Sequence, residues 1–354
     1  MSENKIHAAL AVYDPSGTYS QHAGVVITSL FEHTKSDVIV HILHDDTLTD
    51  LNRERFLKTA ARYNQTVDLI NVEEYKKQID EVTLKNIPER WGIGTLYRLF
   101  IPEILSGIDR VIYLDCDIVV NMDIAELWDI DLGDNALGGA NDSVAYDDFY
   151  KFTPRFINLR LKLLELEREK YINAGVLLMN LNKIRELGNF TEIVLNWLIR
   201  HAHSARAFDQ DALNSIFRDS IKIIDQRFNY FHYTLEDIDL SGNIIHCICA
   251  PKPWLAFPVN KANRLYWKNL FKSEWCCAVT GGMENESPSE EQRLDVFMDK
   301  LSRFMEQGHK EPYHTRIRQG LMNIIKKISR NLLFLKAAGF SRCWDVLYHD
   351  RPSK

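Results

Sequence analysis

An α/β fold, with a mainly parallel sheet covered by helices, is the fold class that this sequence predicts. Two observations support it. Apolar runs rich in β-branched residues alternate with helical patterns through the first 114 residues, and an acidic pair follows directly. Such alternation is typical of βαβ units, whose strands pair in parallel and whose helices cover the sheet.

The expected elements follow in chain order. Asp50, with Arg53 and Glu54 after it, has the features of a helix start, and Gly107 those of a helix end. The segment 143–170 is expected to form a helical lid or insertion. Strands are predicted at 6–12, 38–43, 67–72, 110–114, 136–140, 175–181 and 243–248. Helices are predicted near 21–33, 50–63 and 95–107.

The chain has 354 residues, of which 45% are hydrophobic and 26% charged. This length suits one large α/β domain with an appendage, or two domains. The N-terminus is polar, and no apolar run approaches the roughly 20 residues of a membrane span. Six cysteines without a CxxC pair indicate reduced thiols, and their spacing matches no zinc finger. A cytoplasmic protein is therefore expected.

Charge is distributed unevenly along the chain. Residues 312–354 carry a net charge of +7, which leaves −13 for residues 1–311. An acidic body argues against an enzyme that acts on nucleic acid through a broad basic groove. Apolar residues in the tail recur at spacings of three and four, as in an amphipathic basic helix. This helix either contacts an anionic membrane at the inner face or packs on the parent domain.

These features predict three parts. Residues 1–260 are expected to form the main domain. Residues 261–311 would form a helical extension with a linker near 283–292, and residues 312–354 the basic amphipathic tail.

The acidic pair is Asp115 and Asp117, which follow the strand predicted at 110–114. In an extended segment the residues i and i+2 point the same way, so both carboxylates could bind one divalent cation. The carboxyl ends of strands are also where open α/β sheets bind ligands. The same spacing recurs at 129/131, 209/211 and 237/239, but only this pair follows a predicted buried strand. Unliganded surface acids are the alternative.

Other polar groups are expected at the same edge of the sheet. Tyr13, Asp14 and Tyr19 lie in a loop after the first strand, where they could hold a base or ribose, although both tyrosines could simply pack. Asn173 could bind a ligand or cap its own turn, and Gly175 permits close approach of the backbone. Asp209 could instead be the N-cap of a helix.

His246 ends a late predicted strand and is a candidate third ligand for a cation on Asp115 and Asp117. Two carboxylates and one imidazole suit Mn²⁺ or Mg²⁺, with diphosphate oxygens and water completing the shell. Lys252 would then lie near the phosphates. A structural histidine and a solvated loop lysine are the alternatives.

Taken together, these segments resemble the retaining glycosyltransferases of family 8, which include bacterial lipopolysaccharide galactosyl- and glucosyltransferases and glycogenin. The resemblance covers roughly residues 5–257, in the family's order. The matching pieces are Tyr-Leu-Asp115-x-Asp117, Leu127-Trp128-Asp129-x-Asp131-Leu132, Asn173-Ala-Gly175-Val-Leu-Leu-Met-Asn180-Leu, Asp209-Gln210-Asp211, and His246 with Lys252-Pro-Trp254.

The resemblance implies a GT-A fold: a Rossmann-like mixed sheet that binds a nucleotide sugar, flanked by helices and followed by a helical C-terminal extension. It implies Asp115, Asp117 and His246 as metal ligands and Asp142 as an acceptor contact. The implied nucleotide-sugar contacts are Ala11, Val12, Tyr13, Asp14, Tyr19, Arg98, Asp115, Cys116, Asn173, Ala174, Asp209, Gln210 and Lys252. Two departures are a longer loop at 15–17 and Cys249-Ala250 in place of Gly-Pro.

The implied reaction moves glucose or galactose from a UDP-sugar to a hydroxyl of a saccharide acceptor, in cell-surface glycan or lipopolysaccharide synthesis. A divalent cation, Lys252 and Arg98 would stabilise charge on the leaving diphosphate. Asp209 and Gln210, with the metal-binding Asp115 and Asp117, are the implied catalytic residues. Because an amide is a poor nucleophile, a same-face reaction is favoured over a covalent intermediate, which remains open.

Three other functions compete with a transferase. The segment 114–120 also fits the nucleophile strand of a haloacid-dehalogenase-type phosphatase, but there that strand opens the domain. A sugar-nucleotide pyrophosphorylase would carry a glycine-rich N-terminal loop, which this chain lacks. A non-catalytic nucleotide-sugar-binding protein is the third alternative.

Overall fold

The computed structural model describes residues 5–79, 92–142, 161–202, 204–205, 207–231, 239–248, 252–255 and 261–276. These residues all fall within one compact unit, Met1–Ser287. Most of the expected insertion at 143–170, the Cys249-Ala250 departure, the linker and the tail at 312–354 lie outside the described residues.

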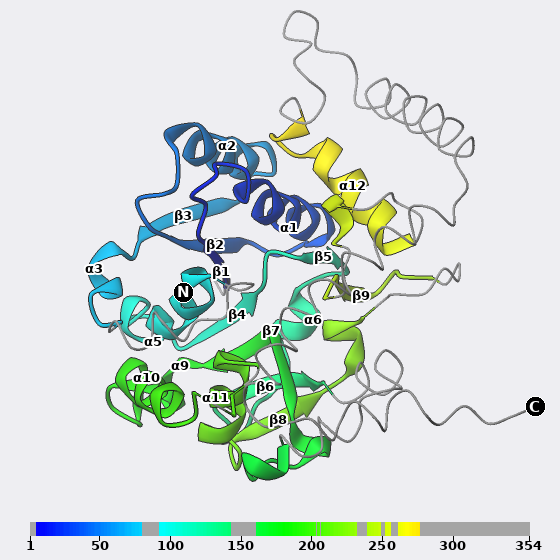
Figure 1. Ribbon diagram of the computed structural model, residues 1–354. Helices are drawn as coiled ribbons and strands as arrows, with labels where there is room; N and C mark the ends of the chain where they lie inside the picture. The colour runs from blue at the N-terminus through cyan, green and yellow to red at the C-terminus, as the bar shows by residue number, and fades with distance from the viewer. Residues whose placement is uncertain are drawn as a thin grey trace, which may run out of the picture. The chain divides into compact units, whose positions relative to one another are not determined.

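The first half of the sheet is parallel, as the strand and helix patterns predict. The strands β1 (Ile6–Val12), β2 (Val38–His44), β3 (Thr66–Asn71) and β4 (Arg110–Leu114) lie in the order β3-β2-β1-β4 (Figure 1). Helix α1 (Ser20–His33) joins β1 to β2, and α2 (Asp50–Arg62) joins β2 to β3. Helix α2 begins at Asp50 because the Thr49 side chain accepts a hydrogen bond from the Asn52 N–H.

The second half of the sheet is mixed. Strand β7 (Ile172–Asn180) runs antiparallel to β4 and to β6 (Leu137–Asn141), and β8 (Ile221–Ile224) runs parallel to β6. The complete order is β3-β2-β1-β4-β7-β6-β8. Four of the sheet's six strand pairs are parallel, so the mainly parallel sheet that the strand patterns predicted is confirmed, with β7 as the antiparallel strand. The mixed sheet is the one that the family resemblance implied.

Alternate side chains of the strands enter two apolar clusters, one on each face of the sheet. On β4, Ile112 and Leu114 belong to one cluster, and Val111 and Tyr113 to the other. The first cluster includes side chains of α1, α2 and α12 (Lys261–Lys272). The second includes side chains of η1 (Ile93–Phe100), α5 (Ile101–Ile104), α9 (Leu181–Arg185), α10 (Phe190–Arg200) and α11 (Asp209–Ile216).

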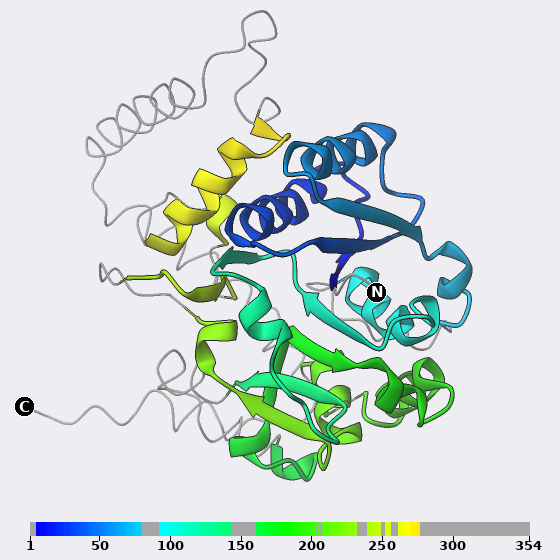
Figure 2. The same ribbon diagram turned by 180° about the vertical axis from the view of Figure 1, so that it is seen from behind.

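A small second sheet and α12 pack beside α1, on the face of the main sheet that carries the first cluster. Strand β5 (Ile118–Asn121) pairs antiparallel with β9 (Asn243–His246). Figures 1 and 2 both show α12 (yellow) beside α1 (blue). The Trp275 ring packs so closely on Gly24 of α1 that a β-carbon there would lie 2.4 Å from it.

The domain boundary at residue 260 stays a prediction. No helix within the described residues is long and apolar enough to cross a membrane.

Candidate active site

Asp115 and Asp117 lie at the carboxyl end of β4, as expected, but the reason for their proximity differs from the prediction. They belong to a turn between β4 and β5, not to an extended strand. Register places Ile118 of β5 opposite His246 of β9, and the Cys247 N–H donates to the Asp117 carbonyl at 2.8 Å. The backbone pairing of two short strands therefore brings the pair to His246, and the three ligand atoms lie within 4.8 Å of one another.

Gly175 makes room for this cluster. Its carbonyl accepts a hydrogen bond from the Asp115 N–H at 2.8 Å. A β-carbon on Gly175 would lie 2.2 Å from Cε1 of His246 and 3.0 Å from Oδ2 of Asp115. The close approach expected at this glycine is thus present. The cluster offers carboxylate oxygens and an imidazole nitrogen, a donor set that fits Mn²⁺ or Mg²⁺.

The Asp117 carboxylate lies between the side chains of His246 and Lys252. Its Oδ1 lies 3.1 Å from Nε2 of His246, and its Oδ2 accepts a hydrogen bond from Nζ of Lys252 at 2.5 Å. Burial opposes ionisation, but His246 and Lys252 outweigh it and hold the pKa of this carboxyl well below its usual range. Asp117 is therefore a carboxylate throughout the physiological range.

Lys252 is positioned by the residues that follow it. Its Nζ also donates to the Cys247 carbonyl at 2.8 Å. Trp254 stacks on His22 of α1 with ring centroids 3.7 Å apart, and Trp267 of α12 donates to the Pro253 carbonyl at 3.0 Å. These contacts hold the Lys252 segment against α1 and α12, and they explain the aromatic residue in the Lys-Pro-Trp motif.

Arg98 of η1 links two carboxylates. It is buried, donates to Oδ1 of Asp115 at 2.8 Å and places its Nε 3.1 Å from Oδ2 of Asp209. It also donates to the Ala174 carbonyl at 2.6 Å, and its guanidinium lies 4.2 Å from the Tyr113 ring centroid. These contacts fix the side chain of Asp115 at the metal cluster.

Asp209 begins α11, but it is not the N-cap, so the alternative to a ligand-binding role does not hold. The N-cap is Phe208, with a strained φ of 51°, and the Asp209 carboxylate turns away to accept a hydrogen bond from Thr95 at 3.1 Å. Its Oδ2 receives no hydrogen bond from the described residues, because the nearby Nε–H of Arg98 points to the Thr95 carbonyl. Burial raises the pKa of Asp209 to about 6, with Arg98 opposing and Asp115 adding to the effect.

Gln210, Asn173 and Asp142 lie together beside this cluster. The Gln210 carbonyl accepts from the Ala174 N–H at 3.0 Å, and its amide donates to Asp142 at 3.2 Å and to the Tyr171 hydroxyl at 3.0 Å. The Asn173 amide donates to the other oxygen of Asp142 at 3.0 Å. Hydrogen bonds thus connect Asn173 and Gln210, which were expected to contact the donor sugar, with Asp142, which was expected to contact the acceptor.

The loop after β1 is held by Asp14. Its buried carboxylate accepts hydrogen bonds from the N–H groups of Tyr19 and Ser20, at 2.7 and 3.0 Å, and from the Asn52 amide. Tyr13 packs on Gly94 of η1, whereas the Tyr19 ring is 38% exposed. Asp14 therefore shapes the loop, whereas Tyr19 is partly exposed and lies edge-on to His22 and beside Cys116.

The remaining predicted contacts, Ala11, Val12 and Cys116, form a buried layer beneath the loop. The Cys116 thiol donates to the Ala11 carbonyl at 3.3 Å, and Val12 is fully buried. Burial, with Asp115 and Asp117 adding to it, raises the pKa of this thiol well above its usual range, so Cys116 stays protonated. Any contact of these three with a ligand would involve backbone atoms.

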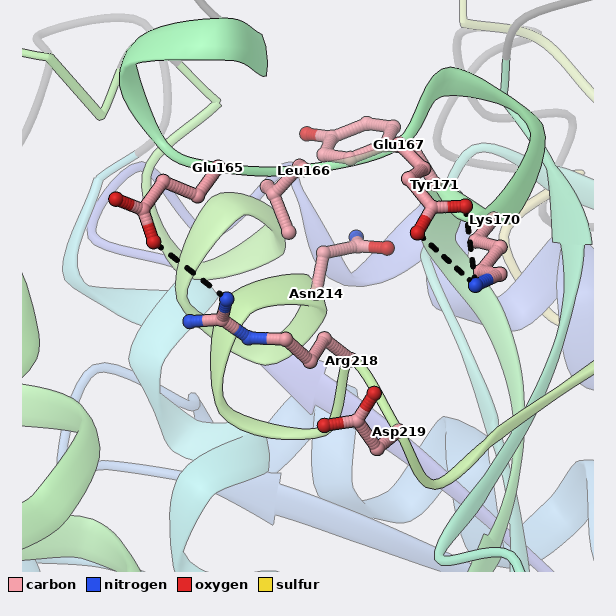
Figure 3. A pocket seen from close by; sticks show the side chains of 8 residues that line it. All are labelled: Glu165, Leu166, Glu167, Lys170, Tyr171, Asn214, Arg218 and Asp219. Atoms are coloured by element: carbon pink, nitrogen blue, oxygen red, sulfur yellow. Dashed lines mark hydrogen bonds and ion pairs between the residues drawn. The ribbon is translucent and has the colours of Figure 1, made fainter.

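A small hollow of about 40 Å³ lies on the other side of Tyr171 (Figure 3). Lys170 pairs with Glu167 on one side of it, and Arg218 pairs with Glu165 on the other, at 3.0 and 3.8 Å. This volume holds only a few waters. The hollow includes none of the Asp115, Asp117 and His246 ligands.

Three site residues carried no signal in the sequence. Asn229 contacts His246, Thr95 contacts Asp209, and Tyr171 contacts Gln210. Thr95 and Asn229 lie in 3₁₀ helices and belong to none of the sequence motifs, so only the fold reveals their partners.

Similarity to known proteins decides among the classes of enzyme that fit this geometry. The family model described as Glycosyl transferase family 8 matches residues 11–257. This chain belongs to glycosyltransferase family 8. Its membership confirms the resemblance inferred from the sequence motifs and identifies the protein as a glycosyltransferase, not a phosphatase, a pyrophosphorylase or a non-catalytic binder.

Curated relatives agree with the family. The chain is 28% identical over 247 residues to a putative glycosyltransferase of Haemophilus influenzae, covering 68% of each chain. It is 26% identical to the lipopolysaccharide 1,3-galactosyltransferase of Salmonella typhimurium, covering 72% of this chain and 76% of that one. It is 24% identical to the lipopolysaccharide 1,2-glucosyltransferase of Escherichia coli, covering 90% of each.

Solved structures confirm the GT-A fold of this family 8 member. The galactosyltransferase LgtC, in complex with donor and acceptor sugar analogs, matches with a TM-score of 0.61 at 21% identity, covering 81% of this chain and 99% of that one. The bifunctional glycosyltransferase WbbM matches with a TM-score of 0.63 at 19% identity, covering 79% of this chain and 52% of that one.

Proposed function

We propose that this glycosyltransferase is metal-dependent and moves glucose or galactose from a UDP-sugar to a hydroxyl of a saccharide acceptor, with retention of configuration. The observation that carries the proposal is the cluster of Asp115, Asp117 and His246, whose ligand atoms lie within 4.8 Å of one another. Mn²⁺ or Mg²⁺ held there would supply positive charge to the diphosphate leaving group.

Lys252 and Arg98 serve this site differently. Lys252 lies at the same carboxylate as the proposed metal, so its ammonium is close enough to bind the diphosphate. Arg98 uses its nitrogens on Asp115, Asp209 and the Ala174 carbonyl, so its contribution is to position Asp115. The proposed nucleotide-sugar contacts are completed by Ala11, Val12, Tyr13, Asp14, Tyr19, Cys116, Asn173 and Ala174, and Asp142 is the proposed acceptor contact.

Asp209 and Gln210 are the proposed residues at the anomeric carbon. Both ends of the Gln210 amide are already hydrogen-bonded, to the Ala174 N–H and to Asp142, which suits a group that orients the sugar. An amide is also a poor nucleophile, so we favour a same-face reaction in which the leaving phosphate guides the acceptor hydroxyl. A covalent route would use the Asp209 carboxylate, and mass spectrometry of the enzyme with donor alone would detect its glycosyl adduct.

The proposed acceptor is a saccharide of a cell-surface glycan or lipopolysaccharide. The names of the Salmonella and Escherichia relatives support this class. Such synthesis would place the enzyme in the cytoplasm, peripheral to the membrane, with the basic segment 312–354 on anionic lipid. Deleting that segment should weaken sedimentation with anionic vesicles, and unchanged sedimentation would contradict membrane contact.

The function is tested by incubating the protein with Mn²⁺ and a panel of UDP-sugars. Metal-dependent release of UDP is expected from one or two donors. Asp117→Ala should remove this activity and keep the circular dichroism spectrum. The matched control is Asp134→Ala, which removes an exposed aspartate after α6 (Ala125–Trp128) and should leave the rate unchanged. Tight donor binding without turnover, or equal rates in Asp117→Ala and the parent, would overturn the proposal.

A further inference from the structure

Asn229 is a fully buried residue that neither the sequence motifs nor the proposed reaction uses. It ends η3 (Gln226–Asn229) and lies between the metal cluster and the sugar pocket. Its Oδ1 is 2.9 Å from Nδ1 of His246, and its Nδ2 is 2.9 Å from Oδ1 of Asn173. One side chain therefore contacts both a candidate metal ligand and a candidate sugar ligand.

The backbone holds Asn229 in this place. The Tyr230 N–H donates to the Ile244 carbonyl at 2.8 Å, and the His246 N–H donates to the Tyr230 carbonyl at 2.9 Å. These bonds join the chain beside Asn229 to β9, the strand that ends in His246. The contact between the two side chains is thus set by strand-like pairing.

The direction of each hydrogen bond follows from one unambiguous donor. The Gly175 N–H donates to Oδ1 of Asn173 at 2.9 Å, within strand β7. Because Oδ1 of Asn173 accepts, the group of Asn229 that faces it must be the Nδ2 donor. The Oδ1 of Asn229 then faces His246 and accepts from Nδ1–H. Nε2 of His246 is left facing Asp117.

A second backbone donor fixes the direction of the hydrogen bonds that Gln210 makes. The Ala174 N–H fixes the Gln210 carbonyl, so the Gln210 amide donates to Asp142. The Asn173 amide donates to the same carboxylate. A continuous set of oriented hydrogen bonds therefore runs from His246 through Asn229, Asn173 and Asp142 to Gln210.

We propose that Asn229 is the positioning residue of this site: it fixes the ring orientation of His246, with Nε2 toward Asp117, and ties that ring to the sugar pocket. The ring orientation needs no bound metal, whereas its use as a metal ligand rests on the proposed function. Histidine ligands usually donate their second N–H to such a partner, and loss of the partner typically weakens metal binding by about 10- to 100-fold.

Two substitutions separate the two contacts. Asn229→Leu keeps the number and branching of the side-chain heavy atoms and removes both hydrogen bonds. Asn229→Asp keeps an acceptor for Nδ1–H of His246 but cannot donate to Asn173. The control is Asn269→Leu, which removes another buried asparagine, on α12, whose amide donates to the Leu265 carbonyl. Circular dichroism and thermal unfolding verify that each variant is folded.

The first readout is the Nδ1–H proton of His246, observed by ¹H–¹⁵N correlation spectroscopy without metal and assigned with His246→Gln. The parent and Asn229→Asp should show this proton hydrogen-bonded and protected from solvent exchange, and Asn229→Leu should lose the protection. If Asn229→Leu keeps the protected Nδ1–H, Asn229 does not position the ring. This readout stands even where no transferase activity is found.

The second readout is Mn²⁺ affinity, measured by electron paramagnetic resonance on the parent and variants. Asn229→Leu should weaken binding about tenfold or more, and Asn229→Asp should stay within about threefold of the parent. Equal losses in both variants, or a similar loss in Asn269→Leu, would mean a merely structural role. UDP-sugar turnover, measured separately, tests the proposed function: without it, the ring readout still decides the role of Asn229.

Discussion

The α-carbon of Gly175 faces the His246 imidazole so closely that a β-carbon would lie 2.2 Å from Cε1. Real β-carbons do not approach other atoms this closely, so any larger residue would displace the ring. His246 is buried, and its Nδ1 is held by Asn229. A glycine on β7 therefore determines where the His246 side chain on β9 can lie.

The first prediction is that Gly175→Ala weakens Mn²⁺ binding about tenfold or more, because the methyl group moves His246 away from Asp117. Isothermal titration calorimetry would measure this. Gly107→Ala is the matched control, since nothing lies within 4 Å of a β-carbon there. Unchanged affinity in Gly175→Ala would show that the ring can shift and still bind, or that His246 is not a ligand.

The second prediction concerns competition at Asp117. The Lys252 ammonium occupies one oxygen of that carboxylate at 2.5 Å, so it opposes a cation at the same group. Lys252→Ala should therefore bind Mn²⁺ tighter by about 3- to 30-fold without nucleotide, a gain of roughly 1–2 kcal/mol. The same variant should bind UDP more weakly, because it lacks the proposed diphosphate contact.

Electron paramagnetic resonance titration measures both parts of this prediction. Lys183→Ala is the control, since Lys183 pairs with Glu186 on the surface of α9. Weaker Mn²⁺ binding in Lys252→Ala than in the parent would mean that the lysine supports the metal site and does not compete with it.

The third prediction is a pH dependence of stability from Asp209. Burial raises its pKa from 3.8 to about 6, so its protonated form stabilises the fold and this contribution is lost as pH rises through about 6. Asn cannot ionise. Asp209→Asn should therefore gain on the order of 1–3 kcal/mol over the parent between about pH 4.5 and about pH 7.5.

Urea unfolding of the parent and Asp209→Asn at both pH values would measure this gain. Asparagine can keep the contact with Thr95, which makes it the conservative replacement. An equal difference between the two proteins at both pH values would show that Asp209 ionises in the folded protein as it does in the unfolded chain.

The strands that the sequence predicts best are those buried on both faces. The predicted limits of β1 and β4 match the structure, because each is a bounded apolar run in the centre of the sheet. Strands β5 and β8 were not predicted, and both are short, with four residues each. The direction of β7 was also not predictable from its pattern, since direction depends on connection and not on composition.

The candidate site was predictable where residues with metal-binding side chains also belong to the family motifs. Asp115, Asp117 and His246 were grouped correctly, although the turn and the β5–β9 register bring them together, not an extended strand. Asn229 was not predictable, because its place depends on backbone bonds to β9 that no local pattern encodes. Ligand types are thus visible in a sequence, while the groups that orient them become visible only in the fold.

The last prediction concerns His22, which lies under Trp254 and accepts or donates a hydrogen bond at 2.6 Å with Tyr266. Burial lowers its pKa to about 4, with Lys252 adding to the effect and Asp117 and Asp14 opposing it. Because the folded-state pKa lies below the usual histidine value of 6.5, the neutral ring stabilises the fold above about pH 6.5, and this stability is lost as pH falls toward about 4.

His22→Phe keeps an aromatic ring beside Trp254 and cannot be protonated. Between about pH 7 and about pH 4.5, the parent should lose on the order of 1–3 kcal/mol more unfolding free energy than this variant, as measured by urea unfolding. Other histidines whose pKa values are lowered, such as His7 and His41, titrate in both proteins and cancel in the comparison. If the unfolding free energies of both proteins depend on pH in the same way, His22 is not the source of the loss at low pH. A steeper fall in the parent would show that acid loosens the contact between α1 and the segment that carries Lys252.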